Sequence, residues 1–166
     1  MLFRSASGAN SVMYWHWHSI HNSFETYWKG LLSHDLKENE TYNEAVIIGN
    51  EFKKFGDKLV NLKKKNDVAI LVSNESLTGL EWFKIDEDTN YNNVVRWMYD
   101  ELYKMNIGTD FIYPLSENLE QYKVIVVPAL YSAPDELLNK LNKYVKAGGH
   151  LIVSFKSGFT NEYLKV

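Results

Sequence analysis

From residue 66 onward the sequence predicts an α/β fold, a parallel sheet with covering helices of the Rossmann-like or flavodoxin-like kind. Three short, continuously apolar segments, at 68–73, 123–130 and 150–155, are typical of strands that are buried on both faces. Segments with helical periodicity separate them along the chain. Strands that alternate with helices form parallel sheets, because a long crossover is needed to start the next strand in the same direction.

The elements before residue 66 follow a different pattern. Aromatic and β-branched residues predict a short strand at 11–17. Residues 18–40 show no regular period and predict a long ordered loop, and loops of this length in compact proteins are usually functional. A helix is predicted at 42–62, where Thr41 and Glu44 have the spacing of a capping box. One apolar stripe runs along it: Ala45, Ile48, Phe52, Phe55 and Leu59.

The first half of the α/β part begins with the predicted strand at 68–73. Residues 74–90 are largely polar and predict an irregular connection. A helix is predicted at 91–105 because its apolar residues recur on one side, and a short strand follows at 109–113. These elements together make one strand–helix–strand unit.

The second half begins with the strand at 123–130. Ser132 is expected to cap a helix that has Pro134 in its first turn. Five residues predict the buried stripe of that helix: Leu137, Leu138, Leu141, Tyr144 and Val145. Gly148 and Gly149 then predict a left-handed turn that ends the helix before the last strand.

Composition excludes several classes of protein. The chain has 166 residues, 45% hydrophobic and 23% charged, as expected of one globular domain or of one domain plus a piece of another. The net charge of -3 gives no general attraction to nucleic acid or to anionic membranes. No apolar run approaches the roughly 18 residues of a membrane span. The sequence contains no cysteine, which excludes disulfides and thiol nucleophiles and fits a cytoplasmic location.

The stretch at residues 13–30, MYWHWHSIHNSFETYWKG, mixes large aromatic residues with imidazoles and a carboxylate. His16 and His18 would share one face of a strand, and with His21 they could hold a zinc ion. The alternative is that these imidazoles make hydrogen bonds in a polar pocket. The sequence offers no matching distant carboxylate, so we expect no metal.

Two further kinds of chemistry have little support. Residues 73–79, SNESLTG, lie where a flavodoxin-like fold places its phosphate loop, but Glu75 would repel phosphate and no G-x-G-x-x-G occurs. A plain surface loop is the simpler interpretation, and we expect no cofactor. Amidotransferase-like folds share the α/β layout but need a cysteine nucleophile, which this sequence lacks. No G-x-S-x-G elbow is present either.

Carbohydrate binding suits the aromatic stretch better. Trp and Tyr rings stack on the C–H faces of pyranose rings, and a carboxylate such as Glu25 can accept hydrogen bonds from neighbouring sugar hydroxyls. The alternative is that the aromatic side chains only fill the end of a barrel.

Residues 7–35, SGANSVMYWHWHSIHNSFETYWKGLLSHD, resemble the eighth strand and following loop of glycoside hydrolase family 42 β-galactosidases. The resemblance continues through the predicted helix at 42–62. Three later segments resemble the trimerisation domain that follows the barrel in that family: NLKKKNDVAILVSNES, KVIVVPALY and AGGHLIVSFKSGFTNE. The resemblance therefore covers essentially the whole chain.

The resemblance implies a retaining β-galactosidase with a (β/α)8 catalytic barrel, assembled as a homotrimer. Trp15 matches an aromatic residue beside the galactose, and Glu25 matches the substrate-binding glutamate of the family. Trp28 stands where other members have histidine, also facing the sugar. The zinc site of the family uses cysteines, which are absent here, so no metal is implied.

The catalytic residues implied by the resemblance are two glutamates on earlier barrel strands, upstream of Met1. Retaining glycosidases need both carboxylates, about 5 Å apart. No catalytic residue is therefore assigned in this chain, which alone is expected to be inactive. Residues 1–62 would be the last strand, loop and helix of the barrel. Residues 66–166 would be most of the trimerisation domain, without its C-terminal end.

A second interpretation stays open from the sequence. The chain could be a free-standing flavodoxin-like module for protein interaction or sugar binding, without catalysis. In the preferred interpretation its partners are a β-galactoside, bound by the full-length parent, and further copies of itself; in neither is nucleic acid or a membrane a partner.

Overall fold

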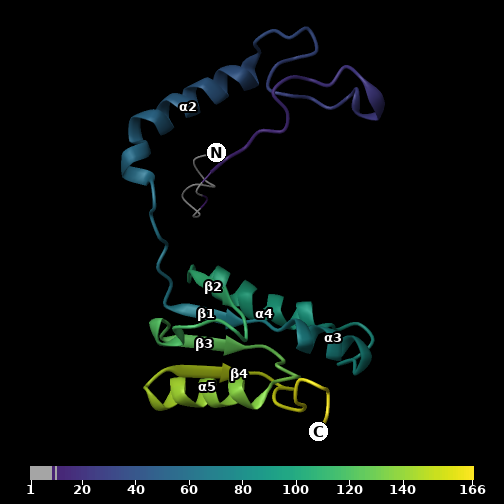
Figure 1. The fold of residues 1–166 in the computed structure, drawn as a ribbon, viewed down its shortest axis with the longest axis vertical. Helices are drawn as coiled ribbons and strands as arrows, with labels where there is room; N and C mark the ends of the chain where they lie inside the picture. The colour runs from purple at the N-terminus through teal and green to yellow at the C-terminus, as the bar shows by residue number, and fades with distance from the viewer. Residues whose placement is uncertain (1–8, 10) are drawn as a thin grey trace. The chain divides into compact units, whose positions relative to one another are not determined.

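A computed structural model describes residue 9 and residues 11–166, and the chain divides into two compact units between Lys64 and Lys65 (Figure 1). The second unit is an α/β sandwich, and the described residues of the first form a long loop with a short 3-10 turn, followed by one α-helix. Within the described part of the chain, no helix combines the length and the apolar character that crossing a bilayer requires.

The sheet of the second unit has four parallel strands in the order β2-β1-β3-β4. The strands are β1 (Val68–Leu71), β2 (Thr109–Ile112), β3 (Val124–Val127) and β4 (His150–Val153). Val68 lies opposite Thr109 on one side and Val124 on the other. This arrangement confirms the predicted fold class, and it confirms that the apolar segments form a parallel sheet.

Helices cover both faces of the sheet, because side chains of successive strand residues point to opposite faces. Helix α5 (Asp135–Lys146) covers one face, and its core comprises Ala69, Leu71, Ile125, Val127, Leu137, Leu141 and Tyr144. Helix α4 (Tyr91–Lys104) covers the other face, and its core comprises Val68, Ile70, Val126, Val95, Met98 and Leu102 (Figure 1).

Helix α3 (Asn74–Trp82) was not predicted, and the irregular connection expected at 74–90 is wrong over this part. The Ser73 side chain caps the helix by accepting a hydrogen bond from the Ser76 backbone N–H (3.1 Å). The Ser76 hydroxyl is itself buried and bonds to both the N–H and the carbonyl of Ser132 (3.1 Å each). The buried side of α3 therefore combines the polar Ser76 with Gly79 and Leu80, and such a short mixed pattern did not indicate a helix.

The start of α3 is also fixed by a buried tyrosine. The Tyr91 hydroxyl accepts a hydrogen bond from the Ser73 backbone N–H (2.9 Å). Burial raises the pKa of Tyr91 above its ordinary value near 10, although this hydrogen bond acts in the opposite direction. The phenol therefore stays protonated at neutral pH.

Helix α5 differs in two ways from its prediction. Pro134 is the N-cap residue, and the Ser132 hydroxyl donates instead to the Asn161 carbonyl (2.9 Å). Of the predicted stripe, Leu138 and Val145 remain 41% and 44% exposed. They flank the buried face of the helix and line a cavity together with Leu151 and Val153 of β4. Gly148 has a φ of +99° and ends the helix as expected.

Strand β4 is hydrogen-bonded to β3 and to no other described strand. Its side chains Ile152 and Val153 remain 53% and 52% exposed on opposite faces of the sheet. An apolar composition on both faces is typical of an inner strand. The composition of β4 therefore suits a more central position than it has in this chain.

In the first unit the strand predicted at 11–17 does not form. A strand needs a partner for its backbone groups, and the described residues of this unit provide only one isolated bridge, between His18 and Leu32. Helix α2 (Glu40–Leu59) does form. Its cap is Asn39, which accepts from the Tyr42 N–H (3.0 Å), so the predicted capping box is wrong.

The predicted apolar stripe of α2 is not buried, since no residue of this helix is buried. An amphipathic helix buries its stripe only where another element offers an apolar surface. The stripe of α2 is therefore a surface that the described part of its unit leaves uncovered.

Candidate functional site

The candidate site is a closed loop at residues 16–34. Its two arms are joined by backbone hydrogen bonds, from Leu31 N–H to the His16 carbonyl (3.0 Å) and from Leu32 N–H to the Trp17 carbonyl (3.0 Å). Ser19 is buried between the arms; its hydroxyl donates to the Leu32 carbonyl (3.1 Å) and accepts from the Gly30 N–H (3.2 Å). We call this joined part, residues 16–19 and 30–32, the neck of the loop.

The neck needs glycine at position 30. An added Cβ would lie 2.6 Å from the carbonyl oxygen and 2.7 Å from the Cα of His18. Backbone atoms cannot yield to such a contact without moving the whole arm. Gly30 therefore lets the two arms approach closely enough to pair.

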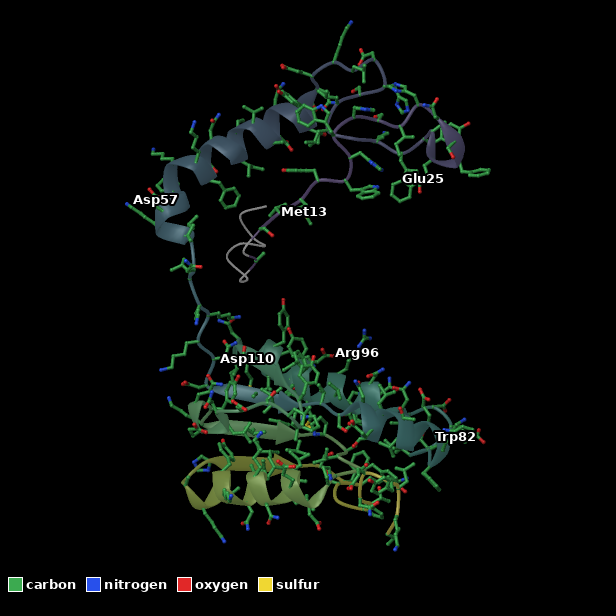
Figure 2. All side chains as sticks on the ribbon, in the orientation of Figure 1. Met13, Glu25, Asp57, Trp82, Arg96 and Asp110 are labelled. Carbon is green, nitrogen blue, oxygen red and sulfur yellow. The ribbon has the colours of Figure 1, made fainter. Side chains whose placement is uncertain are left out.

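The tip of the loop is a short 3-10 turn, η1 (Ser23–Glu25), and it carries the predicted Glu25. Glu25 projects from this turn into solvent (Figure 2). The Trp28 N–H donates to the Glu25 carbonyl (2.9 Å), which keeps the predicted Glu25 and Trp28 on one tight turn. Tyr27 and Trp28 are also exposed. A carboxylate and aromatic side chains thus share the tip.

Trp15 lies on a cavity of about 470 Å³ at the base of the loop. Eleven residues line it: Tyr14, Trp15, His16, Ser19, Lys29, Gly30, Leu31, Ser33, His34, Asn39 and Thr41. Glu25 and Trp28 are not among them. The sequence did not identify Lys29 or Asn39 as site residues; they reach the cavity because the loop folds back on its first arm.

The possible zinc site depended on a strand that would place His16 and His18 on one face. His16 and His18 do not share a strand face, because no strand forms there. The His16 ring contacts the Trp15 ring (centroids 4.4 Å apart), whereas His18 stacks on His21 (5.8 Å). Among the residues that the structure describes, no three His, Asp or Glu side chains are arranged to hold a metal ion.

The carboxyl ends of the strands, where open α/β sheets usually bind ligands, offer no phosphate loop. Residues 74–79 belong to α3, so the predicted plain surface loop is also wrong. The Ser73 hydroxyl donates to the Glu75 carboxylate (3.0 Å) at the start of this helix. A carboxylate in this position disfavours an anionic ligand.

Exposed aromatic rings beside a carboxylate are suited to binding a polar ligand that has apolar faces. Tyr27 and Trp28, close to Glu25 at the tip, are 89% and 55% exposed, and clusters of exposed aromatic side chains usually mark interaction surfaces. A carboxylate such as Glu25 accepts two hydrogen bonds from a ligand that presents neighbouring hydroxyl groups. The loop therefore has the chemistry of one wall of a carbohydrate site.

Comparison with known proteins gives two family matches, one within each unit of the structure. Residues 66–166 match the family described as β-galactosidase trimerisation domain, and residues 1–55 match the family described as β-galactosidase. The β-galactosidase BgaB of Geobacillus sp. (strain Y412MC61) is 35% identical over 164 residues. The match covers 95% of this chain and 23% of that protein.

Solved structures agree in fold. The crystal structure of a β-galactosidase from Bacillus circulans sp. alkalophilus superposes with a TM-score of 0.85 at 30% identity, covering 95% of this chain and 23% of that one. A catalytic mutant of Gan42B, a GH42 β-galactosidase from G. stearothermophilus, gives 0.87 at 24% identity, covering 99% of this chain and 24% of that one. The chain thus spans less than a quarter of the length of these relatives.

Proposed function

This chain belongs to the glycoside hydrolase family 42 β-galactosidases, and from that membership we propose that it forms the C-terminal part of the catalytic barrel and most of the trimerisation domain of a retaining β-galactosidase. The observation that supports this most directly is the continuous match over 95% of the chain to a β-galactosidase, across both units. The proposed boundaries are residues 1–62 for the barrel part and 66–166 for the trimerisation part.

In this proposal the loop at 16–34 forms one wall of the galactose subsite. Barrel enzymes place their sites at the carboxyl ends of the strands, which is where a loop following the eighth strand would lie. Trp15 and Trp28 would stack on the sugar, and Glu25 would accept hydrogen bonds from its hydroxyls. Their exposure supports this, since a site residue must reach its ligand.

The chemical step requires two carboxylates that this chain is not proposed to supply. One would protonate the leaving oxygen and the other would form the glycosyl-enzyme intermediate. Both would come from earlier barrel strands of the longer protein. The DNA upstream of Met1 tests this directly, because the proposal requires several hundred more codons in the same reading frame.

Glu25→Gln in that longer protein is expected to raise KM for an aryl β-galactoside roughly 10- to 100-fold, since a neutral amide loses the charge-assisted hydrogen bonds to the sugar. Glu25→Ala in the 166-residue chain should change the free energy of unfolding by less than about 0.5 kcal/mol, because the side chain is exposed. An unchanged KM, or a clearly destabilised chain, would contradict the proposed role.

We also propose that residues 66–166 associate as a homotrimer. The support is the family description, which names this segment a trimerisation domain.

The lack of cysteine suits the reducing cytoplasm, which we propose as the location of the protein.

Light scattering on the purified chain is expected to give a mass near three times 19.3 kDa. This result would mean that the α/β unit carries enough of the trimer contacts by itself. A mass near 19.3 kDa at high concentration would contradict self-association of this chain and would favour a free-standing module.

A further inference from the structure

We propose that His34 is a positioning residue for the turn that carries Glu25, and that His21 holds His34 in place. The inference rests on the proposed function, which makes Glu25 a substrate-binding residue. It goes further by assigning a role to two histidines that make no contact with the substrate in that proposal.

The contact of His34 with the turn is direct. Its Nε2 atom lies 2.7 Å from the carbonyl oxygen of Thr26, the residue that follows Glu25 and ends η1. A carbonyl oxygen can only accept, so the ring must donate from Nε2. His34 thereby ties the tip of the loop to the arm that returns from it.

His21 supports His34 from the opposite arm. Its Nε2 lies 2.6 Å from the carbonyl oxygen of His34, and the two rings meet edge to face with their centroids 5.5 Å apart. The ring of His18 stacks on the other side of His21 at 5.8 Å. His18 is itself fixed by its Nδ1, which lies 2.8 Å from the Ser19 carbonyl oxygen in the neck.

These contacts form a continuous series from the neck to the tip. The neck fixes His18, His18 packs on His21, His21 donates to His34, and His34 donates to Thr26. The turn is also held by two backbone hydrogen bonds, from Trp28 N–H to the Glu25 carbonyl (2.9 Å) and from Ile20 N–H to the Trp28 carbonyl (3.2 Å). Its packing adds little, since η1 buries no residue and its N-cap side chain makes no capping bond. The two histidine hydrogen bonds add side-chain support to this turn, and the orientation of Glu25 depends on them together with the backbone bonds.

The series predicts which ring nitrogen carries the proton in each neutral histidine. His21 and His34 must carry it on Nε2, and His18 must carry it on Nδ1, because each contacted group is a carbonyl. NMR of the 166-residue chain labelled with ¹⁵N-histidine distinguishes these tautomers. His150 lies in β4 of the other unit, outside this series, and its ¹⁵N signals provide a comparison within the same sample.

Two variants of His34 distinguish a role of its Nε2 hydrogen bond from a role of its side-chain volume. Glutamine places its amide nitrogen near the position of the histidine Nε2, whereas asparagine is too short to reach it. We expect His34→Asn to shift the amide signals of Glu25 and Thr26 and His34→Gln to leave them close to wild type. For D-galactose, we expect His34→Asn to weaken binding about tenfold and His34→Gln to restore it.

Finding the His34 proton on Nδ1, or equal effects of the two variants, would overturn the inference. If His34→Asn unfolds the loop, the tautomers of the wild-type chain still decide the question. The galactose titration tests the proposed function separately. If the wild-type chain shows the expected tautomers and the glutamine rescue but no response to galactose, the positioning role stands and the sugar-binding role fails.

Discussion

Gly149→Ala is expected to destabilise the α/β unit by about 3 kcal/mol, because a Cβ at this position collides with the buried ring of Tyr144. The added carbon would lie 2.5 Å from Cε1 and closer still to two other ring atoms. The ring cannot swing away freely, since its hydroxyl donates to the Tyr122 carbonyl (3.1 Å) in the core. Urea unfolding followed by circular dichroism measures the change.

A double-mutant cycle identifies the cause. If the collision with the ring is responsible, Gly149→Ala should cost much less in a Tyr144→Leu background, where the ring atoms are absent. Equal costs in the two backgrounds would show that the backbone conformation at position 149, and not the contact, requires glycine.

Gly30→Ala is expected to open the neck of the loop in the first unit at a cost of about 3 kcal/mol. The methyl group would collide with the backbone of His18, so the arms must separate. Separation breaks the hydrogen bond from Gly30 to Ser19 and that from Leu32 to Trp17. Hydrogen exchange of the Leu31 and Leu32 amides should accelerate roughly 100-fold.

Gly56→Ala is the matched control for this change. Gly56 lies in α2 of the same unit, and an added Cβ would meet nothing within 4 Å. Alanine is the better helix former, so this variant should stabilise α2 by up to about 1 kcal/mol. Unchanged exchange at Leu31 and Leu32 in Gly30→Ala would show that the neck tolerates a side chain and would contradict the role given to Gly30.

The α/β part could be predicted because its signals are local. Each inner strand is a continuous apolar run, and each long helix has a periodic stripe, so the parallel sheet and helices α4 and α5 follow from short windows of sequence. Helix α3 could not, because Ser76 is buried by its hydrogen bonds to Ser132, which is 56 residues away. Only the folded chain brings these two residues together.

The first unit was harder to predict because its signals depend on partners that its described residues do not supply. The segment at 11–17 has strand composition but no strand to pair with among the described residues, and α2 has a stripe but no surface that covers it. The composition of a segment shows that it could form a strand or bury an apolar stripe. Whether it does so depends on a neighbouring element that pairs with it or covers it. Asn39 replaced the predicted cap because side-chain geometry, not spacing alone, selects the capping residue.

For the site, sequence and structure contributed different residues. The resemblance to family 42 is confirmed by the comparisons, whereas the roles of Trp15, Glu25 and Trp28 remain proposals. Lys29 and Asn39 could not be identified, because they join the cavity only when the loop closes. Gly30 was the available signal, since a glycine within an aromatic stretch often marks a close approach of two backbone segments.

Strand β4 has a consequence for the behaviour of the chain in solution. Its outer backbone groups are unpaired among the described residues, and both of its faces carry exposed apolar side chains. Such an edge is a template on which the strand of another molecule can add, which is a route to aggregation. A lysine at position 152 would place a charge on this edge and discourage that growth. The same edge is where a strand from another molecule would extend the sheet. The exposed edge of β4 that favours aggregation is therefore also a surface on which two chains can associate.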